Sequence, residues 1–292
     1  MRHVARCAMT AVPLIVLTAC SAPDKLPTPA PAAGLTADQV QTVERAREEL
    51  IRRCLTRQGF TYVLTPWADP RETRVIDGVL DDITWAQTYG YGGRIRAKAM
   101  AYKRDNPNSR YLKTLTAKQR ERFATVLYGT PGATLSVRIP SGPVISTSSD
   151  GCLAEADSSL YGDFKTWFRV KTITDNLAPR YLPQVYGDAR FHQAVASWAT
   201  CMREAGFGYT SPSAIRARLA SLKPAEEIRL ATAEARCALA TPLAGTIRDL
   251  KRHYGGIVRR PYEKEITTRK QMESTALMQA QKIVTTSKGV QQ

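Results

Sequence analysis

The sequence of 292 residues lacks the patterns by which metal, redox and nucleotide sites are usually recognised. It holds three histidines, and none of its six cysteines belongs to a Cys-x-x-Cys pair. Neither a GxGxxG nor a GxxxxGK[ST] phosphate-binding pattern is present. We therefore expect no metal and no cofactor. The inventory favours a binding protein over an enzyme and identifies no catalytic residue.

Apolar runs long enough to cross a bilayer are also missing. Residues 8–17 form a short apolar run behind Arg2 and Arg6, which is typical of an export signal. Residues 17–20, Leu-Thr-Ala-Cys, resemble the lipobox of bacterial lipoproteins, whose cysteine is acylated, for example with palmitate. We predict a lipoprotein signal peptide over residues 1–19 and lipidation at Cys20. The alternative is a secreted protein cut near Ala19 that carries no lipid.

Large apolar side chains are scarce over residues 20–36, where four prolines alternate with alanines. Such a segment cannot bury a core, so we predict a lipidated, extended tether. At about 3.1 Å per residue in the polyproline form, it would reach roughly 50 Å.

The most informative feature that is present is a motif used twice. Residues 54–62 (CLTRQGFTY) return as residues 201–209 (CMREAGFGY), with cysteine, Gly-Phe and tyrosine in the same frame. Each copy follows a run with apolar residues at intervals of three and four, which predicts an amphipathic helix. Gly59 and Gly206 are then helix stop signals. We interpret the motif as a disulfide-forming cysteine followed by aromatic residues that pack back on the helix. The alternative is that the aromatic residues stack on a ligand.

Four cysteines remain for pairing once Cys7 is removed with the signal peptide and Cys20 is acylated. They are Cys54, Cys152, Cys201 and Cys237, an even number in an oxidising compartment. Three pairings are possible. The repeat favours Cys54–Cys152 and Cys201–Cys237, because each half of the chain then closes its own loop.

The periodicity of the remaining chain predicts a mainly α fold, with capping boxes at Thr36 and Thr116, a short helix over residues 79–89 and a hinge over residues 163–187. We expect one helical half over residues 37–187 and a second over residues 188–292, each closed by a disulfide. Residues 135–139 alternate and are joined by a Pro-Ser-Gly-Pro turn to a β-prone stretch, so the first half should carry a small β-hairpin. The second half should contain a long amphipathic C-terminal helix that ends in a polar tail over the last twenty residues.

Acidic residues are the scarcer charge, with 26 against 42 lysines and arginines and a net charge of +16. The densest positive stretch lies between Arg94 and Arg122, with ten basic residues against two acidic ones. It is either a solvated helical face or a contact with an anionic surface. The candidate contact residues are Arg94, Arg96, Lys98, Lys103 and Arg104.

One glycine-rich loop precedes this stretch, with the sequence Tyr-Gly-Tyr-Gly-Gly over residues 89–93. Without a phosphate-binding pattern around it, we expect a tight turn with aromatic packing. His192 and His253 lie in no triad or metal motif, so both are interpreted as structural or surface residues.

Four blocks of the chain together resemble those of a group of actinobacterial lipoproteins. They are the repeated motif over residues 54–62, the Tyr-Gly loop over residues 89–92, a Gly-Cys block over residues 151–162 and a Trp-x-x-Cys-Met block over residues 198–209. The resemblance covers most of the mature chain. It implies a lipid-anchored location and disulfides, and it implies no particular activity.

These observations predict an extracytoplasmic lipoprotein held at the outer face of the bacterial cell membrane. We expect a binding or assembly module of the cell envelope, which could serve a transporter. Its expected partners are the membrane through the lipid anchor, anionic lipid or wall polymer, and a membrane protein complex; export argues against nucleic acid. The alternative is an envelope hydrolase or another surface enzyme.

Overall fold

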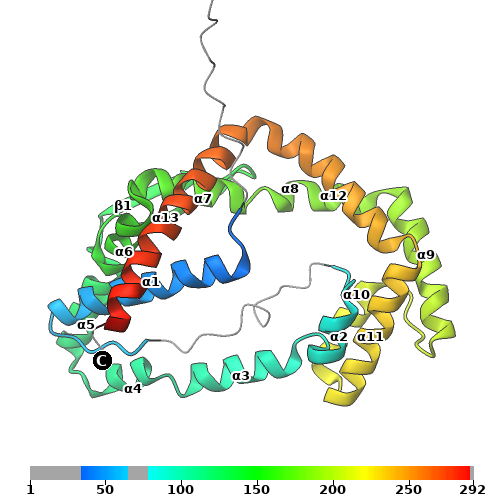
Figure 1. The fold of residues 1–292 in the computed structure, drawn as a ribbon, viewed down its shortest axis with the longest axis horizontal. Helices are drawn as coiled ribbons and strands as arrows, with labels where there is room; N and C mark the ends of the chain where they lie inside the picture. The colour runs from blue at the N-terminus through cyan, green and yellow to red at the C-terminus, as the bar shows by residue number, and fades with distance from the viewer. Residues whose placement is uncertain (1–33, 65–77, 290–292) are drawn as a thin grey trace, which may run out of the picture. The chain divides into compact units, whose positions relative to one another are not determined.

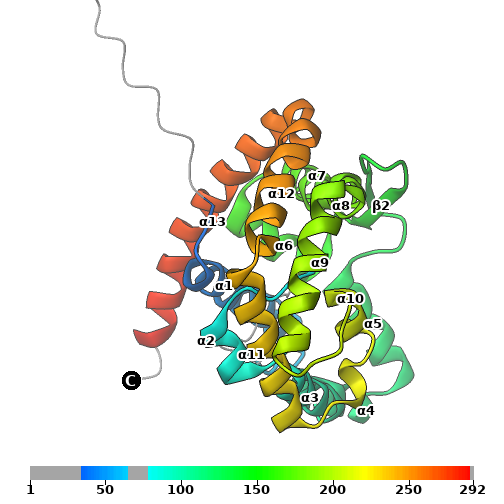
Figure 2. The ribbon, with the colours of Figure 1, turned by 90° about the vertical axis from the view of Figure 1, so that its right-hand side faces the viewer.

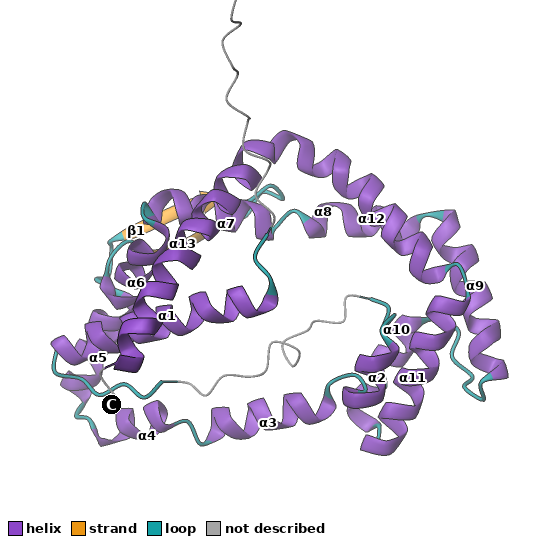
Figure 3. Cartoon of the chain, viewed as in Figure 1, coloured by secondary structure: helices purple, strands orange, loops and turns teal. Residues whose placement is uncertain are grey.

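The computed structural model describes residues 34–64 and 78–289, and most of these residues are helical (Figures 1 and 3). Two short strands form the one sheet of the described chain. The mainly α fold predicted from the sequence is confirmed. The α-helices are α1 (Ala37–Arg57), α2 (Ile83–Tyr89), α3 (Gly93–Arg104), α4 (Pro107–Thr114), α5 (Ala117–Tyr128), α6 (Gly151–Tyr161), α7 (Phe164–Asp175), α8 (Ala178–Gly187), α9 (Ala189–Glu204), α10 (Pro212–Arg216), α11 (Pro224–Ala240), α12 (Leu243–Arg259) and α13 (Glu263–Gly289).

Polar side chains cap the helices where the sequence predicts. Thr36 begins α1 with a capping box, in which its hydroxyl accepts from the Gln39 amide and the Gln39 side chain accepts from the Thr36 amide. Thr116 begins α5 in the same way. Each reciprocal pair satisfies backbone N–H groups that have no partner within the helix.

The predicted hairpin consists of β1 (Thr134–Arg138) and β2 (Val144–Ser148). The strands are antiparallel, with Thr134 opposite Ser148 and Arg138 opposite Val144. The connection delivers the chain to Gly151, whose φ of 86° favours glycine, and α6 begins there.

The first helix, α1, forms the centre of one part of the core. It packs against α5, α6 and α13, and α13 (red in Figure 1) crosses it. Ala276 and Ala280 of α13 are fully buried in this contact. Their small side chains let the two helices approach closely. The predicted polar tail is therefore wrong, because α13 continues to Gly289 and buries this apolar stripe.

The helix α11 forms the centre of the other large cluster. It packs against α2, α9 and α12, and α9 and α11 run close together in Figure 2. Trp198 and Met202 of α9 and Leu230 of α11 are almost completely buried there. Contacts cross the boundary predicted between residues 187 and 188 in both directions, since α2 packs on α11 and α13 packs on α1. The division into two halves stays a prediction.

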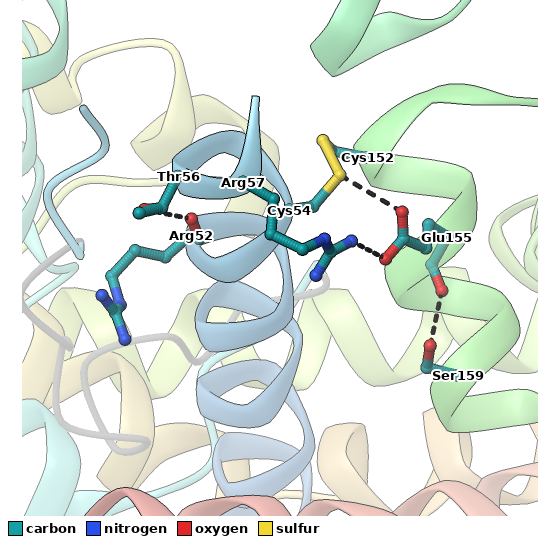
Figure 4. The surroundings of a disulfide bond; sticks show 7 residues. All are labelled: Arg52, Cys54, Thr56, Arg57, Cys152, Glu155 and Ser159. Carbon is teal, nitrogen blue, oxygen red and sulfur yellow. Dashed lines mark hydrogen bonds and ion pairs between the residues drawn. A yellow bond between two sulfur atoms is a disulfide. The ribbon is translucent and has the colours of Figure 1, made fainter. Parts of the chain in front are cut away.

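Both predicted disulfides are present, Cys54–Cys152 and Cys201–Cys237. They join residues 98 and 36 positions apart in the chain. In the chain-entropy description, loops of this size stabilise the folded state by about 5 and about 4 kcal/mol, before any strain. Figure 4 shows the first bond, which joins α1 to the start of α6.

Some helix boundaries differ from those predicted. The helix α2 begins at Ile83 rather than near Val79, because the Asp82 carboxylate accepts from the Trp85 amide and caps it. The predicted hinge over residues 163–187 consists of α7 and α8, and Pro183 lies inside α8. None of the described helices is both long enough and apolar enough to cross a membrane.

Candidate functional site

The predicted lipidation site, Cys20, lies outside the described residues, as do residues 1–33 as a whole. Its acylation and the tether stay predictions.

The five candidate contact residues all lie on α3, and all five are exposed. No residue of this helix is buried, and none is acidic. Ile95 and Tyr102 are half-buried and share one face of the helix, because they lie seven residues apart. The apolar Met100 is 54% exposed. The helix therefore presents a large cationic surface.

The first two arginines of α3 hydrogen-bond to backbone carbonyl groups. Arg94 Nη2 donates to Thr88 O at 3.3 Å, and Arg96 Nη1 donates to Tyr91 O at 2.6 Å. A carbonyl group carries no net charge, so these bonds orient the guanidinium groups without neutralising them. At the other end of the helix, Lys103 and Arg104 lie in the last turn, where the helix dipole favours positive charge.

Positive charge gathers at the first turn of α3, and a glutamate of α11 offsets it. Arg94 and Arg96 place positive charge near the positive end of the helix dipole, and no acidic residue of α3 lies there. The buried Glu227 of α11 provides the missing negative charge. Its Oε1 accepts from the Tyr91 and Gly93 amides, each at 2.8 Å. Gly93 is the first residue of α3.

The glycine-rich loop over residues 89–93 is thus an anion cradle, and a carboxylate of the same chain occupies it. A Cβ atom at Gly90 or Gly93 would overlap the Glu227 side chain. Gly90 also has a φ of 61°, which side chains other than glycine rarely adopt. The expected tight turn is present, since the Gly92 amide donates to Tyr89 O at 2.8 Å. The loop therefore has two roles. Its aromatic residues pack, as expected, and its amides bind the Glu227 carboxylate.

A second glutamate of α11, Glu234, is completely buried and accepts four hydrogen bonds. Arg216 donates to both of its oxygens, at 2.6 and 2.8 Å. The Tyr91 hydroxyl donates at 2.6 Å and the Leu80 amide at 3.0 Å. A buried charge is tolerated when its partners satisfy it in this way.

Tyr91 links the two glutamates, with its backbone amide on Glu227 and its hydroxyl on Glu234. The Arg216 guanidinium lies over its ring, 4.7 Å from the centroid. Burial, and next the charge of Glu234, raise the pKa of the Tyr91 hydroxyl. It therefore stays protonated and remains a hydrogen-bond donor at physiological pH.

Sequence reasoning missed both glutamates, although the signal for them exists. Glu227 and Glu234 lie seven residues apart, in phase with the buried residues Leu230, Ala231 and Ala238 of α11. Residues at this spacing share one face of a helix. Acidic residues on an apolar face indicate that buried donors lie opposite them.

Each disulfide borders a surface pocket. The pocket beside Cys54–Cys152 has a volume of about 500 Å³ and is lined in part by Asp150 and Glu155. Glu155 forms an ion pair with Arg57, and its Oε2 lies 3.3 Å from the Cys54 sulfur (Figure 4). The Ser148 hydroxyl and the Thr130 amide hydrogen-bond to Asp150 and lower its pKa.

The pocket beside Cys201–Cys237 has a volume of about 570 Å³. It lies between the C-terminal end of α9 and the outer face of α11, and Phe207 of the second motif copy lines it. We call it the Phe207 pocket.

Neither histidine belongs to an assembled catalytic group in the described part of the chain. His192 and His253 are exposed, and their closest ring contacts are Phe191 and Tyr254. Over residues 34–64 and 78–289, no three His, Cys, Asp or Glu side chains come together in a way that could hold a metal ion.

Replacing Gly93 by alanine should destabilise the protein. The new methyl group would displace the Glu227 carboxylate and leave buried polar groups without partners, which costs about 1–3 kcal/mol. Gly245→Ala is the matched control, because Gly245 lies in α12 and a methyl group there meets nothing within 4 Å. It should raise stability by up to about 1 kcal/mol through helix propensity. Urea unfolding measures both. Equal effects of the two substitutions would show that Glu227 does not fix the start of α3.

No known protein family, no curated protein and no solved structure matches this chain.

Proposed function

We propose that the protein is an extracytoplasmic lipoprotein, anchored at Cys20, whose folded body binds anionic surfaces through α3. In this proposal it serves as a binding or assembly module at the outer face of the cell membrane. Anionic phospholipid head groups and anionic wall polymers are the surfaces within its reach. A membrane protein complex, such as a transporter, is the proposed protein partner.

Two independent features support an extracytoplasmic location. The sequence pairs a short apolar leader with a lipobox, as described above. The folded part contains two disulfides, which persist in oxidising compartments and are rare in the bacterial cytoplasm.

The observation that carries the proposed contact is the exposure of α3. Its five basic residues are exposed, and the described part of the chain offers Arg94, Lys103 and Arg104 no carboxylate partner. A solvated helical face is usually balanced by charges of both signs, whereas this helix carries one sign alone. Of the carboxylates near this helix, Asp105 pairs with Arg110, and Glu227 is turned inward and bound by the loop amides.

The expected strength of the contact between α3 and an anionic surface follows from the number of its charges and their distance from that surface. A basic residue close to an anionic membrane contributes about 1 kcal/mol. Salt screens exposed charges beyond about 8 Å at physiological ionic strength. Several residues of α3 must therefore approach the surface together, and a rigid helix held at its start by α11 allows this.

The lipid anchor can be tested by Cys20→Ala. We expect the wild-type protein to fractionate with membranes and to carry acyl chains on Cys20 by mass spectrometry, whereas the variant leaves the membrane fraction. Membrane association of an unacylated variant, together with the absence of lipid on the wild type, would contradict the anchor.

The surface contact can be tested with residues 36–292, which carry no lipid, mixed with neutral and anionic vesicles at low and physiological salt. We expect binding to anionic vesicles alone, weakened by salt. Neutralising three charges, by Arg94→Gln, Lys103→Gln and Arg104→Gln, should lower the partition coefficient more than tenfold, since each contributes about 1 kcal/mol.

A matched variant controls for total charge. Arg218→Gln, Arg260→Gln and Lys264→Gln remove three exposed charges from other parts of the chain. This variant should bind almost as well as the wild type. Equal losses in the two triple variants would assign the attraction to net charge rather than to α3.

A further inference from the structure

The two copies of the repeated motif end their helices with the same backbone geometry. Gly59 has a φ of 80° and Gly206 a φ of 85°. The Phe60 amide donates to Leu55 O at 2.9 Å, and the Phe207 amide donates to Met202 O at 2.8 Å. This is the hydrogen bond that closes a helix ending in a left-handed glycine. The copies thus place their phenylalanines alike relative to the preceding helix.

The first phenylalanine is covered by a neighbouring helix. Phe60 is 5% exposed, and the Phe123 ring of α5 meets it edge-on with the centroids 5.2 Å apart. The Arg122 guanidinium lies over the same ring, 5.1 Å from its centroid. An aromatic ring and a guanidinium group therefore cover the phenylalanine of the first copy.

The second phenylalanine packs against the buried cluster around α11 but has no such aromatic cover. Phe207 is half-buried, and no aromatic ring of the described residues packs on it. Instead it lines the Phe207 pocket, together with Ile228, Ala233 and the disulfide. The pocket volume of about 570 Å³ lies within the range of small-molecule sites.

The lining of this pocket carries more positive than negative charge. Arg229 and Arg236 lie seven residues apart on α11, two helical turns along one face, and both are exposed. Neither pairs with a carboxylate of the described residues. Glu204 is the one carboxylate among the lining residues, so two guanidinium groups face a single negative charge. An anionic ligand complements this balance.

We infer that the Phe207 pocket binds a small ligand that carries an aromatic ring and a carboxylate. The ring would pack on Phe207 as Phe123 packs on Phe60, and the carboxylate would accept hydrogen bonds from Arg229 or Arg236. Both a free aromatic acid and a peptide ending in phenylalanine have this chemistry. The site lies on the outer face of α11 and does not depend on the membrane contact of α3.

Ligand-observed NMR titrations of the full chain test the inference with three probes. N-acetylphenylalanine represents a peptide terminus, 3-phenylpropionate represents a free aromatic acid, and N-acetylphenylalanine amide lacks the negative charge. We expect both acids to bind at least tenfold more tightly than the amide. The tighter of the two acids identifies the source of the ligand.

Variants then test whether the acids bind in the Phe207 pocket. Arg229→Gln with Arg236→Gln should weaken binding of the acids at least tenfold. Ala205→Trp, at an exposed lining position, should block the pocket without disturbing the core. Arg218→Gln with Lys223→Gln removes the same charge elsewhere and should change nothing. Circular dichroism checks that each variant is folded. Equal binding of acid and amide, no binding of either acid, or affinity unchanged in both pocket variants would overturn the inference.

Discussion

Two buried carboxylates on one face of α11 fix the arrangement of the elements around them. Glu227 and Glu234 cannot stay ionised away from water unless donors surround them. The loop before α3 provides amides, Tyr91 provides its hydroxyl, and Arg216 provides a charged partner. Because these donors come from separate segments of the chain, satisfying the glutamates brings α2, α3 and α10 together around α11. Removing one donor would leave a buried carboxylate with fewer hydrogen bonds, which destabilises the fold.

The same arrangement explains how α3, which has no buried residue, is held in the fold. α3 contributes little to the apolar core, and its first-turn arginines oppose its own dipole. Glu227 offsets that charge and holds the first amide of the helix. Most of α3 remains exposed, and its five basic residues lie on this exposed surface. The proposed contact depends on Arg94, Lys103 and Arg104 of this helix, which have no carboxylate partner in the described part of the chain.

The local signals in the sequence predicted much of the fold. The capping boxes at Thr36 and Thr116 and the glycine stops at Gly59 and Gly206 all lie where the structure ends or begins a helix. The repeat predicted both disulfides. The sequence did not predict the partners of Glu227 and Glu234, because the donors lie more than 130 residues away for the loop. The sequence predicted a C-terminal helix but not its continuation through the last twenty residues, because the buried positions there, Ala276 and Ala280, are alanines, which produce a weak apolar pattern.

Hydrogen exchange of the backbone amides, measured by mass spectrometry on residues 36–292, tests the central claim most directly. Exchange is compared in buffer, with neutral vesicles and with anionic vesicles. If α3 is an anchored helix that contacts anionic surfaces, anionic vesicles alone should slow exchange over residues 93–104. The amides of Tyr91 and Gly93 should be protected in all three conditions, because Glu227 binds them. Unchanged exchange over α3 with anionic vesicles, or rapid exchange at both loop amides, would contradict the account.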